Sequence, residues 1–152
     1  LALTGSEVVR LPAEWEWQWV AQSGAVGREY PWASRWNPMR ANSYESGIGR
    51  TAAVGMYPRG VPDPWPVLDL AGNVWEWCLN EHAQPSSTRL DQNVSRVLRG
   101  GSWLSAPGDC RAALRYDFAP DGRSGGLGFR VCCGAPIEPL TAVPLDTVTL
   151  PH

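Results

Sequence analysis

Short apolar runs bounded by glycine mark the stretch 96–131, around which the chain is organised. Val97-Leu98 precede Gly100-Gly101 and Trp103, and a similar run occupies residues 128–131. Runs of this kind are typical of short buried strands. The residues between them are small, polar or turn-forming. The pattern therefore predicts two framework strands that hold an irregular surface segment, and loops on a scaffold often carry function. The alternative is a glycine-rich connection without a role.

One helix is predicted between residues 12 and 24. Pro12 suits the first turn of a helix, and Gly24 is a typical stop. Trp15 and Trp19 lie one turn apart, and Trp17 widens the apolar arc. We expect this tryptophan-lined arc to pack into the core.

The remaining segments have little periodicity. Residues 30–53 read as a long irregular loop, 54–57 as a short strand, and 79–95 as an exposed loop. A loop as long as the first one needs something to hold it, often a metal or a function. Glycine, proline and short apolar runs together favour a loop-rich α+β fold over a helical bundle.

Composition limits the classes of partner. The 152 residues fit one domain or part of a larger one, and a net charge of -2 without a basic stripe gives no reason to expect nucleic acid. No apolar run is long enough to cross a bilayer. Because the chain begins at Leu1 rather than Met, we expect an N-terminal part of the same polypeptide before it, and no cellular location is predicted.

Cysteine and histidine spacing excludes several chemistries. The four cysteines, of which Cys132 and Cys133 are adjacent, do not follow a zinc pattern. We expect reduced, partly buried thiols, while a Cys78–Cys110 disulfide stays open. With only two histidines and no nucleophile elbow, neither a serine hydrolase nor a facial iron triad is expected.

A Gly-Asn turn between Asp69 and Glu76 offers hard oxygen donors. Two carboxylates together with turn carbonyls can hold a cation such as calcium. The alternative is a turn whose carboxylates bond backbone N–H groups.

Several motifs, taken in order, resemble the formylglycine-generating enzyme, or sulfatase-modifying factor, family. They are LPAEWEW (11–17), YPW (30–32), GRTAAVG (49–55), DLAGNVWEW (69–77), RVLRGGSW (96–103) and LGFRV (127–131). The resemblance implies a C-type lectin-like α+β fold with short antiparallel strands, few helices and much irregular loop. It makes residues 1–133 the C-terminal portion of such a domain. Residues 134–152 form a proline-rich tail, which is either an extended arm or disordered.

The resemblance also implies structural calcium. One ion would be held by the side chains of Asp69 and Glu76 with the carbonyls of Gly72 and Val74. A second would lie at Asn42 with the carbonyls of Ser43 and Ile48, in a loop that is shorter here than in the family.

Oxidase members of the family bind copper through two cysteines that follow GGSW. Here the first of these positions is Ser105, and only Cys110 remains at the second. Because soft copper(I) needs both thiolates, no copper and no oxidase activity are expected.

The segment 104–126 resembles the variable region of the variable proteins of diversity-generating retroelements, which use the same fold. Residues in the variable slots can all be reached from an asparagine codon by changing its adenines. The resemblance implies a binder of an unknown ligand, expected to be a protein, with framework arginines that bond carbonyls or stack on tryptophan. A formylglycine-generating oxidase and a structural accessory domain are the alternatives. The slots are Leu104, Ser105, Ala106, Gly108, Asp109, Leu114, Tyr116, Asp117, Phe118, Ala119, Gly122, Ser124, Gly125 and Gly126.

Overall fold

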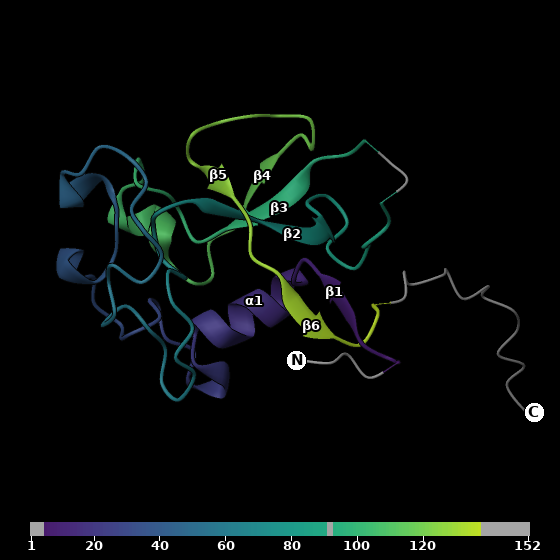
Figure 1. The fold of residues 1–152 in the computed structure, drawn as a ribbon, viewed down its shortest axis with the longest axis horizontal. Coiled ribbons are helices and arrows are strands. Elements are labelled where there is room, and N and C mark those ends of the chain that lie inside the picture. Colours follow the sequence, from purple (N-terminus) through teal and green to yellow (C-terminus); the bar gives the residue numbers. More distant parts are fainter. Residues whose placement is uncertain (1–4, 91–92, 138–152) are drawn as a thin grey trace, which may run out of the picture.

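A four-stranded sheet forms one half of the molecule in the computed structural model, which describes residues 5–90 and 93–137. At its centre, β2 (Trp75–Glu81) pairs antiparallel with β3 (Arg96–Arg99). On the outer side of β3, β4 (Tyr116–Phe118) is antiparallel, and on the outer side of β2, β5 (Leu127–Gly128) is parallel. The strand order is β4-β3-β2-β5 (Figure 1). The consecutive strands β4 and β5, which the glycine-rich stretch connects, thus lie on opposite edges of one sheet.

A second, two-stranded sheet joins the two ends of the described chain. In it, β1 (Val8–Arg10) runs antiparallel to β6 (Cys132–Gly134) (Figure 1). Gly134, assigned to the tail from the sequence, is therefore the last residue of a strand. The predicted arm or disordered tail beyond residue 137 lies outside the described residues.

The predicted helix is confirmed as α1 (Glu14–Ala21), which lies below the four-stranded sheet and beside the two-stranded sheet in Figure 1. The prediction that its whole tryptophan arc is buried is wrong. Trp17 is 2% exposed, whereas Trp15 and Trp19 are 49% and 51% exposed. The buried stripe is formed instead by Glu14, Trp17 and Ala21, which follow helical spacing. A charged residue can occupy that stripe because Arg99 pairs with it.

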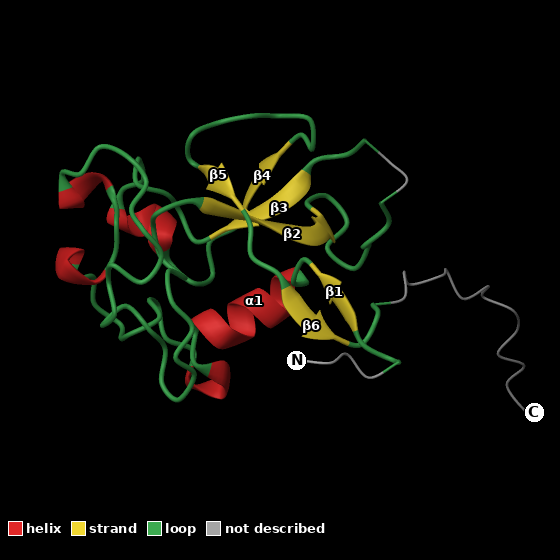
Figure 2. Ribbon diagram, in the orientation of Figure 1, coloured by secondary structure: helices red, strands yellow, loops and turns green. Residues whose placement is uncertain are grey.

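The core has two parts. The first packs α1 on the sheet and contains Trp17, Leu70, Cys78 and Val97. The second supports the irregular half of the molecule, which Figure 2 shows as loops and short helices. There the rings of Tyr30, Trp32 and Trp36 lie with centroids 5.2–5.7 Å apart. The short 3₁₀ helices span Gly24–Val26, Pro38–Arg40, Tyr44–Ser46 and Pro107–Cys110.

Three predicted segments differ in the structure. Residues 54–57 form a turn rather than a strand, and Val54 is 81% exposed. The exposed loop expected from residue 79 begins later, because β2 continues to Glu81. Of the framework strand expected at 128–131, only Gly128 lies in a strand, β5 (Leu127–Gly128), and Phe129 is 68% exposed. In each case the secondary structure depends on whether the segment pairs with a distant strand, and this outweighs the local propensity of its residues.

No helix within residues 5–90 and 93–137 combines the length and apolar character needed to span a membrane.

Candidate ligand-binding surface and its support

A pocket of about 190 Å³ opens on the sheet, among the residues that the sequence assigns to the variable slots. Its wall combines strands β2 to β5 with the loop after the Gly100-Gly101 pair. The parallel pairing of β5 with β2 brings Leu127 next to Trp75, and the pairing of β4 with β3 brings Tyr116 next to Leu98. The lining residues are Trp75, Leu98, Ser102, Leu104, Ser105, Tyr116, Phe118, Ser124, Gly126 and Leu127.

Two aromatic side chains of the edge strand β4 stand on one face of the sheet. Tyr116 and Phe118 are two positions apart in the strand, so they share a face, and they are 52% and 36% exposed. The Tyr116 ring stacks on Trp75 with centroids 5.3 Å apart, and Phe118 meets Trp77 edge-on at 6.5 Å. Each ring thus contacts a tryptophan of β2 and remains partly open to solvent.

Most of the variable slots lie at the surface. The exposed slots are Leu104, Ala106, Gly108, Tyr116, Phe118, Ala119, Ser124 and Gly125. Four slots are half-buried, namely Asp109, Leu114, Asp117 and Gly122. Ser105 and Gly126 are buried, so they shape the pocket and present no side chain outward.

The framework arginines bond backbone carbonyls, as expected from the sequence. Arg99 donates to the carbonyls of Ala112 and Leu114, at 3.0 and 2.8 Å. Its guanidinium also lies 5.7 Å from the centre of the Trp17 ring. Arg111 and Arg123 fasten the exposed loop in the same manner. The acceptors are the carbonyls of Gly108 for Arg111, and of Asp121 and Gly122 for Arg123.

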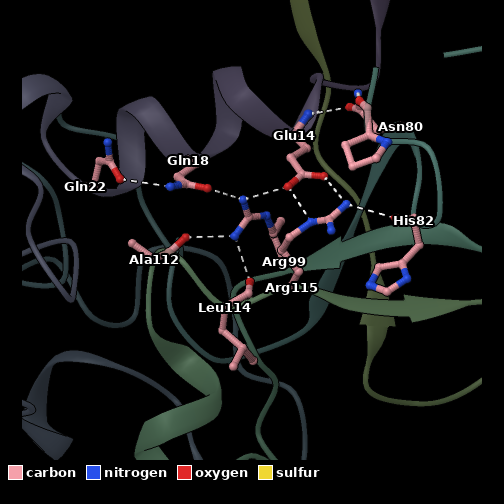
Figure 3. Close-up of polar contacts among 10 residues, drawn as sticks. Glu14, Gln18, Gln22, Asn80, His82, Arg99, Ala112, Leu114 and Arg115 are labelled. Carbon is pink, nitrogen blue, oxygen red and sulfur yellow. Dashed lines mark hydrogen bonds and ion pairs between the residues drawn. The ribbon is translucent and has the colours of Figure 1, made fainter. Parts of the chain in front are cut away.

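A buried ion network anchors this segment to α1 (Figure 3). Glu14 is 9% exposed, and its Oε1 lies 3.2 Å from Arg99 Nη2 and 2.6 Å from Arg115 Nε. Arg115 also donates to the His82 carbonyl, and Gln18 Oε1 accepts a hydrogen bond from Arg99. Burial is the largest influence on Arg99 and lowers its pKa, while Glu14 opposes the shift. One carboxylate thus serves two arginines that hold the backbone before β4.

The remaining copper position is not a reactive thiol. Cys110 is fully buried, and burial raises the pKa of its thiol to about 12. A Cβ on Gly101, whose φ is +76°, would lie 2.7 Å from Cys110 Sγ, so a glycine is needed there. Ser105, at the first copper position, accepts a hydrogen bond from the Ser102 amide at 2.9 Å. Both side chains are buried. Cys78, Cys110, Cys132 and Cys133 are all free thiols in the structure.

The predicted first calcium loop is held by an arginine. Glu76 is buried and accepts hydrogen bonds from Trp17 Nε1 at 2.7 Å and from Arg130 through both carboxylate oxygens. Arg130 also donates to the carbonyls of Leu68 and Asp69. Asp69 Oδ2 accepts from the Gly55 amide at 2.8 Å, the contact expected if the turn holds no metal. These groups fit a calcium ion only in part, because Arg130 already neutralises Glu76.

Gly72 and Val74, the carbonyl donors of this set, lie in the turn before β2. A Cβ on Gly72 would lie 2.2 Å from the Asn42 carbonyl oxygen, which explains the glycine in this motif. In the described part of the chain, no three His, Cys, Asp or Glu side chains gather at one point. A metal here would therefore depend on backbone oxygens.

The second calcium loop is fastened by hydrogen bonds. The Asn42 amide donates to the Arg50 carbonyl at 2.9 Å and to Asn73 Oδ1 at 3.2 Å. Asn42 Oδ1 accepts from the Ser46 hydroxyl at 2.8 Å, and the Ser43 carbonyl accepts from the same hydroxyl. Ile48 is half-buried beside them. Two of the three oxygens assigned to calcium thus accept hydrogen bonds from Ser46, which helps to hold the long loop.

The fold and this framework define an α+β domain of the C-type lectin-like, formylglycine-generating-enzyme type. The family model of the sulfatase-modifying factor enzyme 1-like domain matches residues 2–135, so the chain belongs to this family.

Similar proteins in the family include both active and inactive enzymes. The chain is 35% identical over 141 residues to inactive C-alpha-formylglycine-generating enzyme 2 of Bos taurus, covering 83% of this chain and 44% of the relative. It is 36% identical over 146 residues to the formylglycine-generating enzyme of Streptomyces coelicolor, covering 80% and 45%. The chain therefore spans less than half the length of these curated relatives.

Among solved structures, Treponema denticola variable protein 1 superposes with a TM-score of 0.71 at 28% identity, covering 84% of this chain and 48% of that one. PvdO from Pseudomonas aeruginosa superposes with a TM-score of 0.67 at 26% identity, covering 84% and 53%.

Proposed function

We propose that this chain is a ligand-binding protein, the variable protein of a diversity-generating retroelement, and that it does no catalysis. The observation that carries the proposal is the placement of Tyr116 and Phe118, whose rings are open to solvent at the edge of a pocket. Their backbone follows a segment that Arg99 and Arg115 fasten to α1. A fixed backbone that presents open side chains lowers the entropic cost of binding.

The ligand is proposed to be a protein. A volume of about 190 Å³ is below the range of about 300–1,000 Å³ found for small-molecule sites. It suits one large side chain of a partner, in the way that an anchor residue fills a pocket at the centre of an interface. The exposed slots around it, with aromatic, small and polar residues, resemble the composition of antibody paratopes.

The absence of catalysis is supported by the two positions that would bind copper. Ser105 and Cys110 are both buried, and the Cys110 thiol is protonated at neutral pH because its pKa is about 12. An uncharged thiol is a poor nucleophile.

Replacement of the exposed slots tests the display role. We expect Tyr116→Ser and Phe118→Ser to fold with a loss of about 1–3 kcal/mol, because each removes one aromatic pair together with the partly buried area of the ring. The matched control is Gly126→Ser, a change at a slot that is buried rather than exposed. The Cβ of the new serine would lie 3.2 Å from Ser102 Oγ. Thermal unfolding measures all three variants. Loss of folding on replacing Tyr116 or Phe118 would show that they are core residues and contradict the proposal.

Neighbouring DNA provides an independent test of diversification. A near-copy of the segment that encodes residues 104–126, with asparagine codons at the slots and a reverse transcriptase beside it, is expected. Genomes of siblings that never vary at these slots would instead favour a structural accessory domain.

The second candidate is an oxidase, which the 36% identity to the Streptomyces coelicolor enzyme favours. The protein would be incubated with copper, oxygen and a cysteine-containing sulfatase peptide, and the peptide mass followed. We expect no change in mass, because no pair of accessible thiolates is present at Ser105 and Cys110. Conversion of the cysteine would establish the oxidase.

Calcium is proposed from the family resemblance at Asp69, Gly72, Val74 and Glu76. Asp69 contributes a carboxylate there, and Arg130 competes for Glu76.

A further inference from the structure

A second pocket, of about 560 Å³, lies apart from the display surface and is rich in arginine. It forms where residues 27–29, after α1, meet residues 111–115, before β4. Leu114 is the one predicted slot that it contains. The lining residues are Gln22, Gly27, Arg28, Glu29, Arg111, Ala113, Leu114 and Arg115.

The lining of this pocket carries more positive than negative charge. Arg28, Arg111 and Arg115 face one acidic residue, Glu29, which is exposed. Arg115 is paired with Glu14, but the same carboxylate also pairs with the buried Arg99. Excess positive charge therefore remains around the pocket.

Two of the guanidinium groups retain free donors among the residues that the structure describes. Arg28 makes no side-chain hydrogen bond or ion pair there, and it is half-buried. Within residues 5–90 and 93–137, Arg111 uses only Nε, which donates to the Gly108 carbonyl at 2.8 Å. Its two terminal nitrogens are left to bind something else. A guanidinium with free terminal nitrogens matches the two oxygens of a carboxylate or phosphate.

The walls of the pocket are fastened before any ligand arrives. The Arg28 amide donates to the Gln22 carbonyl at 2.9 Å, and the Ala112 amide donates to the Glu29 carbonyl at 2.8 Å. Arg99 holds the Leu114 carbonyl at 2.8 Å. The backbone that carries these arginines is thus ordered, which reduces the entropic cost of binding.

We propose that this pocket binds an oxyanion, a carboxylate or phosphate group of a small ligand, through Arg28 and Arg111. The volume lies within the range of about 300–1,000 Å³ of small-molecule sites. Neither Arg28 nor Arg111 is a variable slot, so both proposed anion-binding side chains stay in place when the slots vary, and Leu114 is the one slot on the wall. The two proposals can therefore fail separately.

Calorimetric titration of the whole chain with inorganic phosphate and, separately, with citrate tests the site at constant ionic strength. We expect saturable one-to-one binding of at least one anion, and the tighter of the two identifies the group. Arg28→Gln and Arg111→Gln should each weaken binding at least tenfold. The control is Arg50→Gln, because Arg50 is exposed and, in the part of the chain that the structure describes, only its carbonyl takes part in a hydrogen bond, from Asn42.

Thermal unfolding establishes that the variants are folded, and both replaced side chains are accessible enough for the unfolding temperature to stay near that of the parent. No saturable binding of either anion would overturn the proposal. Equal weakening by Arg50→Gln would also overturn it, since that result indicates attraction by net charge alone.

Discussion

Arg99→Met removes the buried cation that joins α1 to the display segment. The side chain of Arg99 is fully buried, and it pairs with Glu14 and bonds two backbone carbonyls, those of Ala112 and Leu114. Methionine keeps some of the packing against Trp17 but donates no hydrogen bond. The variant therefore leaves two backbone carbonyls without a hydrogen-bond donor, and it leaves Arg115 as the one arginine paired with Glu14 among the described residues.

The expected loss of stability follows from these contacts. A buried polar group without a partner costs about 1–3 kcal/mol, and breaking a buried ion pair by removing one partner costs about 3–5 kcal/mol. Arg115 still neutralises Glu14, so we expect a total of about 3–4 kcal/mol. Small domains are stable by only about 5–15 kcal/mol, so this is a large fraction.

Urea denaturation followed by tryptophan fluorescence measures the change. With a slope of about 1–3 kcal/mol per molar urea, the midpoint should fall by at least about 1 M. Arg99→Lys keeps the charge but loses the forked hydrogen bonds, so its loss should be intermediate. Arg50→Met is the control and should stay within about 0.5 kcal/mol. A cost below about 1 kcal/mol for Arg99→Met would refute the view that this network holds the segment.

Three further predictions concern the thiols and calcium. In the native protein, iodoacetamide at pH 8 should label the exposed Cys133 first and leave the buried Cys78 and Cys110 unlabelled, as read by mass spectrometry; rapid labelling of Cys110 would contradict its burial. Burial raises the pKa of the Cys78 and Cys110 thiols to about 12 from 9.0, so their contribution to stability is complete below pH 9 and is lost as pH rises from 9 to 12. Urea denaturation between pH 8 and 11 should therefore show falling stability, and a smaller fall in Cys110→Ala; an equal fall would refute the assignment. Millimolar calcium should raise the unfolding temperature relative to EDTA, and Asp69→Asn should remove the rise; no rise in the parent protein would show that Arg130 holds this loop alone.

The comparison of sequence and structure is clearest at α1. Pro12 and Gly24 were enough to place the helix, since the signals that begin and end a helix are local. They were not enough to orient it, because Trp15 and Trp19 proved to be exposed. The orientation depends on Arg99, which lies 85 residues from Glu14 in sequence and makes a buried carboxylate tolerable. Periodicity of apolar residues contains no information about such a partner.

For the candidate surface, too, some features follow from the sequence and others only from the tertiary structure. The order of the motifs determined the family and the loop-rich α+β fold, because each motif serves a local turn or strand. That the segment 104–126 is the binding surface stays a prediction. That Ser105 and Gly126 are buried follows from the close approach of loops, which no spacing in the sequence reveals.

What the sequence by itself determined was the family, the helix and the role of the arginines as carbonyl donors, since these follow from short motifs and from residue chemistry. Only the tertiary structure decided which of those residues meet. Tyr116 and Phe118 lie beside a pocket, and Arg28 and Arg111 line another. Glu76 pairs with Arg130. The physical reason is that burial and pairing depend on segments that are distant along the chain, whose approach is set by the packing of the whole fold.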